Sequence, residues 1–455
     1  MPREVRPGCG PAHLASRASV GQTARRDRPA RAAGQLSSTM TEASGNSGNS
    51  GNSGNSGNSG NSGNSGNSGN SGNSGNTAPG PGAEPAARGT GTGSAGVSMA
   101  WIDSDAALVA LLARWDAAPA LGLDTEFMRV HTFWPELALV QVQVGAETVL
   151  IDPKAKVDLR TLSERVRRPG RVVIMHSASE DLIALAPLAP DGEPPIVGLF
   201  DTQIAAAFAG LGPGLGYQRL VAELTGVELA KGETRSDWLK RPLSAQQLVY
   251  AAADVVHLPA LHEQLEARLA SRSMRAWFQE DCDRLCASSG ADDLQPHLAF
   301  TSLWRLAPEH QARLRRVLRW REALARRIDR PRAWIFDNAL AGSLIETPPA
   351  DANALAERLR GQRSFPRREI GTLFDLLSAP LAPEEVEVPP IPAPIRGEAA
   401  ARMNEARTRA AARATELDLP PALLCPRRLL EAWVREERPA ELDGWRGQAL
   451  AGCLG

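Results

Sequence analysis

The chain of 455 residues is poor in lysine, cysteine and tyrosine, and it contains no long apolar run. Four lysines stand against 47 arginines, a bias typical of GC-rich coding, so any single arginine cluster is a weak indication of function. Only two tyrosines occur, Tyr217 and Tyr250. Tyr250 lies one helical turn before an aspartate, and this placement makes it a candidate functional residue.

The five cysteines are odd in number and match no metal-binding spacing. Without a secretory signal, such a set argues against a disulfide-bonded secreted protein and predicts reduced thiols in the cytoplasm. No segment approaches the roughly 18 apolar residues that a membrane-spanning helix needs, so no membrane partner is expected. The first 40 residues carry seven arginines and two acidic residues, which resembles a transit peptide, but they contain no apolar segment. We expect a cytoplasmic protein.

Residues 1–98 lack periodic apolar positions, and residues 45–74 are ten copies of Gly-Asn-Ser. Such a segment buries too little apolar surface to offset the entropy of ordering it. Residues 1–98 are therefore expected to be a disordered, low-complexity extension or a mis-assigned start before Met99. The remaining 357 residues, 99–455, suffice for two or three domains.

Charge differs between the regions of the chain. Residues 1–98 have a net charge of +4, residues 99–290 of −7, and residues 291–455 of +2. Binding to a polyanion needs local positive charge. The acidic region 99–290 therefore argues against a simple phosphate-binding surface, unless something else brings phosphate there.

Apolar patterning predicts an α/β domain with a mixed sheet over residues 99–290. The expected strands cover 121–128, 137–144, 148–151, 172–175 and 197–201, and the expected helices include 179–188, 203–208, 217–224 and 244–270. Beyond residue 300 the strand signals disappear. Two small all-helical modules are expected, at 300–380 and 395–455, joined by a proline-rich linker at 380–394.

Asp124 and Glu126 lie two positions apart in the first of these strands. Residues i and i+2 of a strand share a face, so both carboxylates project together while Thr125 faces the other way. Two adjacent acids repel each other unless a cation neutralises them. Alone, such a pair is more often a solvated strand edge than a metal site.

Two further elements carry acids. His176 ends a buried strand, and Asp181 follows in the first turn of a helix that Ser177 or Ser179 could cap. Helix capping and a favourable dipole interaction explain that acid equally well when it is taken alone. Tyr250 and Asp254 share one face of a later helix because they are four residues apart. Ordinary surface polarity is the alternative there.

Together, four carboxylates and a phenol are what a two-metal phosphodiesterase requires. Hard oxygen ligands hold Mg²⁺ or Mn²⁺. A metal pair clamps the attacking water and the leaving oxygen of an in-line displacement. Bound cations would also account for the acidic domain, since they invert the local field.

Four segments resemble the DEDDy branch of 3′→5′ exonucleases, and most closely the ribonuclease D family. They are LDTEF (123–127), HSASEDL (176–182), FDTQIAA (200–206) and RSDWLKRPLSAQQLVYAAADV (235–255). The resemblance implies a ribonuclease H-like α/β catalytic domain at 99–290. It also implies a helicase-and-ribonuclease-D C-terminal (HRDC) domain at 300–380 and a weaker second copy at 395–455.

The resemblance also assigns roles to residues. Asp124, Glu126, Asp181 and Asp254 would bind two divalent cations, Mg²⁺ or Mn²⁺, and Tyr250 would orient the attacking water. Further matching positions are expected to be structural: His176, Asp201, Asp237 and Trp238.

The implied activity is 3′→5′ exoribonucleolytic trimming of tRNA precursors and other small structured RNAs with single-stranded 3′ tails, releasing nucleoside 5′-monophosphates. No obligate protein partner is implied. Two alternatives stay open: a DNA 3′→5′ exonuclease with the same chemistry, and a non-catalytic RNA-binding adaptor. Nine arginines between residues 308 and 332 are equally consistent with a solvated helix and with a nucleic-acid contact.

Overall fold

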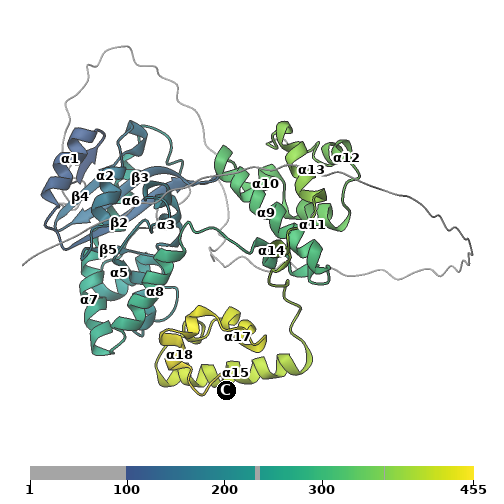
Figure 1. Cartoon of the computed structure of the whole chain (residues 1–455). Helices are drawn as coiled ribbons and strands as arrows, with labels where there is room; N and C mark the ends of the chain where they lie inside the picture. The colour runs from purple at the N-terminus through teal and green to yellow at the C-terminus, as the bar shows by residue number, and fades with distance from the viewer. Residues whose placement is uncertain (1–98, 231–235, 363, 455) are drawn as a thin grey trace, which may run out of the picture. The chain divides into compact units, whose positions relative to one another are not determined.

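The structure, a computed structural model, describes residues 99–230, 236–362 and 364–454 (Figure 1). The extension expected at residues 1–98 lies outside these ranges. Within them, none of the helices combines the length and the apolar character that crossing a bilayer would require.

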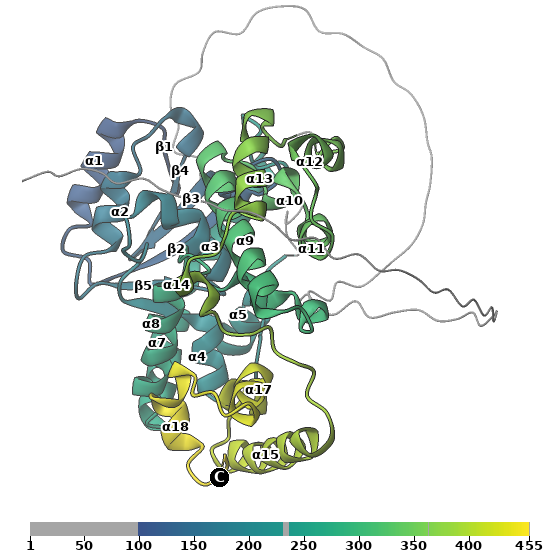
Figure 2. The ribbon, with the colours of Figure 1, turned by 45° about the vertical axis from the view of Figure 1, so that its right-hand side comes forward.

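Within the described ranges, six strands form one mixed sheet. They are β1 (Met99–Ile102), β2 (Ala120–Met128), β3 (Glu136–Val144), β4 (Glu147–Ile151), β5 (Val172–Met175) and β6 (Leu199–Asp201). Their order is β1-β4-β3-β2-β5-β6, and Figure 2 shows the first five side by side. β3 runs antiparallel to β2 and β4, and the other neighbours are parallel. The predicted α/β class with a mixed sheet is confirmed.

Among the residues that the structure describes, eight α-helices accompany the sheet. They are α1 (Asp105–Arg114), α2 (Arg160–Val166), α3 (Ser179–Leu185), α4 (Thr202–Phe208), α5 (Tyr217–Thr225), α6 (Ala245–Val256), α7 (Leu258–Ser271) and α8 (Arg275–Ser288). The single helix predicted over 244–270 is wrong, because the chain breaks at His257 between α6 and α7. Pro259 explains the break, since it has no N–H and its ring clashes with the preceding turn.

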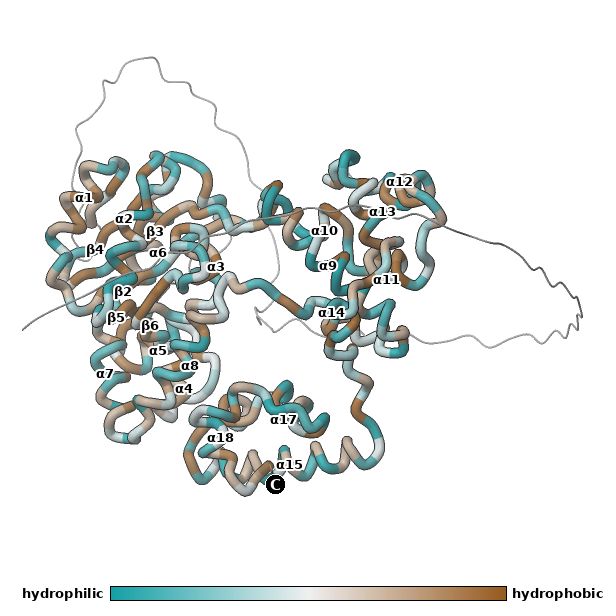
Figure 3. The backbone as a smooth tube through the Cα atoms, viewed as in Figure 1, coloured by the Kyte–Doolittle hydropathy of each residue, from teal (hydrophilic) through white to brown (hydrophobic). Residues whose placement is uncertain are grey.

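Alternation along the strands divides the sheet between two cores. Leu123 and Val142 belong to a large core that also contains Leu111 of α1. The opposite face carries Leu139, which packs with Ala251 of α6 in a smaller core. Figure 3 shows hydrophobic residues concentrated along the strands of this domain. Because Leu139 pairs with the acid Glu126 across the sheet, α6 covers the face on which the β2 acids lie.

β2 extends past the end of its neighbour β5. Only the segment Ala120–Gly122 of β2 pairs with β5, so the β2 acids lie beyond that ladder. Gly122 lets α7 approach closely, because a Cβ at this position would lie 3.1 Å from atoms of Leu258. The end of β2 that lies beyond β5 can therefore be contacted by α3, α6 and the start of α7.

The rest of the described chain is helical. The first group comprises α9 (Pro308–Ile328), α10 (Arg332–Ile335), α11 (Asn338–Glu346), α12 (Ala352–Arg358), α13 (Ile370–Ser378) and α14 (Pro383–Val386). The second comprises α15 (Gly397–Glu416), α16 (Pro421–Leu424), α17 (Arg427–Val434) and α18 (Trp445–Ala449). Single turns of 3₁₀ helix lie at Pro153–Ala155, Ala186–Leu188, Pro296–Ala299, Thr301–Leu303, Arg367–Glu369 and Ala440–Leu442. The expected linker at 380–394 thus contains one short helix, α14.

The two helical groups are stabilised differently. The first has a hydrophobic core of its own, which includes Leu318 and Phe336. The second shares the core of the α/β domain: Trp445 stacks on Trp277 of α8 with ring centroids 5.0 Å apart. Asp281 of α8 accepts hydrogen bonds from the Trp445 indole and from the guanidinium of Arg446.

The arginines between 308 and 332 bind the protein itself, which neither the solvated-helix nor the nucleic-acid interpretation predicted. Eight of the nine bind carbonyl or side-chain oxygens of the protein itself; these are Arg313, Arg315, Arg316, Arg321, Arg326, Arg327, Arg330 and Arg332. Arg316, for example, pairs with Glu385 and with three carbonyl groups around the end of α13. Most of this positive charge therefore stabilises the helical module.

Candidate active site

Asp124 and Glu126 of β2 meet Asp254 of α6. Each offers one carboxylate oxygen, and these oxygens all lie within 4.8 Å of one another. The alternation of β2 places the first two on one face, as predicted. α6 covers that face, and Asp254 lies in its last turn. All three side chains are partly exposed, so a ligand can reach them.

Asp181 of α3 lies beside this cluster and is buried. Its Oδ1 atom accepts a hydrogen bond from the Thr125 hydroxyl at 2.5 Å. Its charge acts on both Asp124 and Asp254. Thr125 can reach Asp181 because β5 ends before this point, and the start of α3 occupies the space that the next strand residues would fill.

The turn between β5 and α3 brings Asp181 to this position. Ser177 adopts a left-handed conformation with φ of 58°. Asp201 holds the turn, because its carboxylate accepts the N–H groups of Ser177 and Ala178 at 3.2 and 2.8 Å. The predicted capping of α3 by Ser177 or Ser179 is wrong: Ala178 is the N-cap residue, and no side chain caps α3. Asp201 also caps α4, which agrees with its expected structural role.

The four carboxylates shift each other's pKa values. Burial raises the pKa of Asp124 well above its usual value, and the charges of Asp181, Asp254 and Glu126 raise it further. Burial, Asp254 and Asp181 together raise the pKa of Glu126 to about 8. Burial also raises the pKa of Asp181 to about 7. For Asp254, burial raises the pKa to about 7 although a hydrogen bond from Tyr250 lowers it.

Both tyrosines of the chain lie next to Asp254. The Tyr250 hydroxyl hydrogen-bonds the Asp254 side chain, and burial together with the nearby acids raises its pKa. Tyr250 therefore keeps its proton and acts as a donor. Trp238 lies beside Tyr250 with ring centroids 6.0 Å apart, in agreement with a packing role. The Tyr217 hydroxyl donates to the carbonyl oxygen of Ala253 at 3.0 Å.

Sequence reasoning missed three residues around the carboxylates. Thr125 was assigned to the opposite face, yet it bonds Asp181. Gln141 is fully buried directly opposite Asp124 in the β2·β3 pair, and neither of its amide atoms has a hydrogen-bond partner among the described residues. Tyr217 could have been found only from the scarcity of tyrosine.

The donor set suits a hard divalent cation. All four groups are carboxylates, which favour Mg²⁺ or Mn²⁺ over softer metals. Burial and neighbouring acids raise their pKa values, and among the described residues no lysine or arginine forms an ion pair with them. A cation would relieve this repulsion, and a bound water or phosphate oxygen could complete its coordination.

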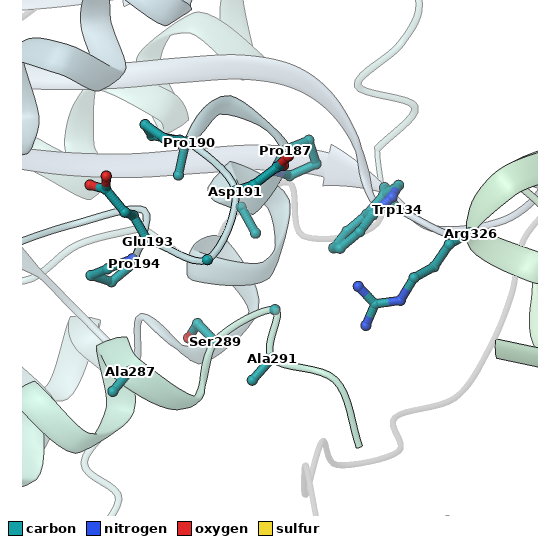
Figure 4. A pocket seen from close by; sticks show the side chains of 14 residues that line it. Trp134, Pro187, Pro190, Asp191, Glu193, Pro194, Ala287, Ser289, Ala291 and Arg326 are labelled. Atoms are coloured by element: carbon teal, nitrogen blue, oxygen red, sulfur yellow. The ribbon is translucent and has the colours of Figure 1, made fainter. Parts of the chain in front are cut away.

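In the described part of the chain, one cavity opens onto the candidate site and another of similar volume does not. One, of about 530 Å³, opens onto Tyr250 and Asp254 and is lined by apolar residues such as Leu229 and Val249. Another, of about 560 Å³, is lined by the 186–194 segment, by residues near Ser289, and by Trp134 and Arg326 (Figure 4). None of the four carboxylates lines the second cavity, so it is separate from the candidate site.

Comparison with known proteins places the chain in a family. A family described as 3′–5′ exonuclease matches residues 99–270. Ribonuclease D of Xanthomonas oryzae pv. oryzae is 45% identical over 338 residues, which cover 73% of this chain and 92% of the relative. Ribonuclease D of Pseudomonas paraeruginosa is 37% identical and covers 78% of this chain and 97% of its own length.

A solved structure agrees with these relatives. Escherichia coli RNase D, described as an exoribonuclease involved in structured RNA processing, superposes with a TM-score of 0.66 at 28% identity. The match covers 78% of this chain and 96% of that one. The similarity therefore extends past the sheet into the helical part of the chain.

Proposed function

The chain belongs to the ribonuclease D family and is a 3′→5′ exoribonuclease, and from this premise we propose its site, mechanism and substrate. The enzyme trims the 3′ ends of tRNA precursors and other small structured RNAs in the cytoplasm. It hydrolyses the terminal phosphodiester with two divalent cations and releases nucleoside 5′-monophosphates.

One observation carries the proposed site. Asp124, Glu126 and Asp254 converge within 4.8 Å, and each has a raised pKa because it is buried and lies close to other acids. Asp124 would contact both cations, Glu126 and Asp254 would hold the one on the nucleophile side, and Asp181 would support the other. Bound Mg²⁺ or Mn²⁺ would supply Lewis-acid stabilisation and lower the pKa of the attacking water.

Tyr250 would orient that water. Its hydroxyl proton is directed to Asp254, and its raised pKa keeps it protonated. A phenol in this state is a poor base, but its oxygen can accept a hydrogen bond from water and fix the direction of attack. Positioning is thus the expected contribution of Tyr250, with proton removal left to solvent or to the carboxylates.

The family and the shape of an RNA end support the proposed substrate. A structured RNA is recognised mainly by shape and backbone, and its single-stranded 3′ tail can enter a carboxylate site without base readout. We assign residues 99–290 to catalysis, and 300–380 and 395–455 to HRDC-type modules that contact the body of the RNA. The cavity beside Tyr250 and Asp254 offers room for a terminal nucleotide.

Digestion of a tRNA precursor with a 3′ extension tests the proposal. Shortening from the 3′ end, release of nucleoside 5′-monophosphates and loss of activity with chelator are expected. Asp124→Ala and Asp254→Ala should bind the RNA and leave it uncut. Activity that survives complete metal removal would refute the mechanism.

Two further assays test the remaining alternatives, a DNA exonuclease and a non-catalytic RNA-binding adaptor. The same tRNA body carrying an RNA or a DNA tail of one sequence distinguishes the sugars, because only RNA offers a 2′-OH. Faster removal of the DNA tail would replace the RNA assignment. RNA retention on a gel without any product in Mg²⁺ or Mn²⁺ would support a binding adaptor and contradict the enzyme.

A further inference from the structure

We propose that Tyr217 is a positioning residue for the metal site: its hydroxyl completes the broken end of α6 and thereby fixes Asp254. The inference rests on the proposed function, because it takes Asp254 to be a metal ligand. It gives a role to the second of the chain's two tyrosines.

The need for such a residue comes from the break between α6 and α7. In a continuous helix the N–H of His257 would bond to the carbonyl of Ala253. Pro259 prevents continuation, and the N–H of His257 instead contacts the carbonyl of Val255. The Ala253 carbonyl, one residue before Asp254, therefore needs another donor. A helix end with an unsatisfied group of this kind is costly when buried.

Tyr217 supplies that donor. Its hydroxyl donates to the Ala253 oxygen at 3.0 Å, and its oxygen accepts from the backbone N–H of His257. The phenol thus bridges the two groups that the break has separated. Burial and the charges of Asp254 and Asp124 raise its pKa, which keeps the donating proton in place.

The ring of Tyr217 also contacts the element that leads to Asp181. It meets the ring of His176 edge-on, with centroids 5.5 Å apart. Two hydrogen bonds fix the orientation of the His176 ring. The Thr202 hydroxyl donates its proton to the carbonyl of Met175 at 3.0 Å. Because that proton is used, the Thr202 oxygen accepts from the Nδ1–H of His176 at 2.8 Å. Tyr217 therefore touches both chain segments that carry acids from outside β2.

The alternative is that Tyr217 is only a core aromatic residue. In that case the ring would matter and the hydroxyl would not. The two explanations differ in a single atom, and Tyr217→Phe removes that atom while keeping the ring and its contact with His176.

The experiment compares Mn²⁺ binding by isothermal titration calorimetry on chelator-stripped, full-length protein. Removing residues that orient metal ligands costs about 10- to 100-fold in metal affinity or activity. Tyr217→Phe should therefore bind Mn²⁺ about tenfold more weakly and lose about tenfold in kcat, while KM for the RNA stays unchanged.

Thr225→Val is the matched control. Thr225 lies at the other end of α5, and its hydroxyl donates to the carbonyl of Val221 at 2.8 Å. This variant also loses one hydroxyl from the same helix, but it should bind Mn²⁺ like the wild type. Circular dichroism at the assay temperature confirms that both variants are folded.

Wild-type Mn²⁺ affinity in Tyr217→Phe, or an equal loss in Thr225→Val, would overturn the positioning role. Asp124→Ala separates this failure from failure of the proposed function. If Asp124→Ala is inactive and Tyr217→Phe behaves like the wild type, only the role of Tyr217 is wrong. If Asp124→Ala retains full turnover, the metal site itself is wrong and the inference falls with it.

Discussion

The pKa values of acidic residues shift in opposite directions in the candidate active site and in the first helical module. Burial raises the pKa of Asp124 and of Glu126, the latter to about 8. Burial also acts to raise the pKa of Glu322 in α9, but hydrogen bonds from Arg332 and Arg326 outweigh it and hold that pKa below its usual value. The Arg316 guanidinium holds the pKa of Glu385 at about 2.

The difference between the two groups of acids lies in whether arginine or lysine side chains pair with them. In a chain with 47 arginines, guanidinium groups pair with acids throughout the helical part. Within the described ranges, no lysine or arginine forms an ion pair with Asp124, Glu126, Asp181 or Asp254. The structure thus leaves these four acids without protein cations, which is consistent with their binding of external ones.

The largest expected effect comes from removing the acid at the centre of the cluster. Asp124→Ala should lower kcat by at least about 10³-fold, because groups that act as one catalytic unit cannot replace each other. The metal-free variant should be at least as stable as the wild type, since one source of repulsion is gone. Single-turnover RNA digestion and thermal unfolding in chelator measure the two quantities. A strong loss of stability would show that Asp124 is neutralised by the protein after all.

Removing an acid from a protein ion pair should instead lower stability. Asp281 and Arg446 are both nearly buried and joined at 2.6 and 2.7 Å. Asp281→Ala leaves a buried guanidinium unpaired, which costs about 3–5 kcal/mol of unfolding free energy. Urea denaturation measures the loss, and Asp443→Ala, which breaks an exposed pair with Arg438, is the control with little expected change. Unaltered stability in Asp281→Ala would remove the contrast between the two kinds of acid.

Tyr250→Phe should give an intermediate effect on catalysis. It removes the hydroxyl that bonds Asp254, and a positioned proton-handling group contributes about 10²-fold or more to rate. The expected result is a fall of about 10²-fold in kcat with RNA binding retained, measured by steady-state kinetics and a gel-shift titration. A matching loss of RNA affinity would indicate a substrate-binding role instead.

The smallest expected effect is a pH-dependent stabilisation by metal. The folded protein holds protons on Glu126, Asp181 and Asp254 up to about pH 7 to 8, whereas the unfolded chain releases them near the ordinary carboxyl pKa. Because folding then takes up protons between these values, the metal-free protein should lose stability as the pH rises from 6 to 8. Mn²⁺ should therefore raise the melting temperature more at pH 8 than at pH 6. Equal shifts at both values would contradict the assigned pKa directions.

Much of the fold was predictable because its signals are local. Alternation gave β3 and its neighbours, and the spacing of Asp124 and Glu126 placed both on one face of β2. The break at His257 was missed, because the apolar period runs through Pro259 without interruption. The Thr125–Asp181 bond was missed for a different reason: it depends on β5 ending early, and strand pairing is a tertiary property that no single segment reveals.

The convergence of the candidate residues was predictable from the sequence, but the contacts that support them were not. Asp254 and Tyr250 follow from the i, i+4 rule, whereas Tyr217 is 36 residues away from the carbonyl that it bonds. Contacts of this range depend on how α5 packs against the end of α6. The pKa values also required the fold, since they arise from burial and from the proximity of four acids on three elements.

Proton release on metal binding tests the central claim most directly. If external cations are the missing partners of the four acids, Mn²⁺ must displace the protons that the raised pKa values retain. Calorimetric titration at pH 6.5 in buffers of different ionisation enthalpy should show protons released per Mn²⁺ bound, and this number should fall towards zero at pH 9. Mn²⁺ binding without proton release at pH 6.5, or no Mn²⁺ binding at all, would contradict the account.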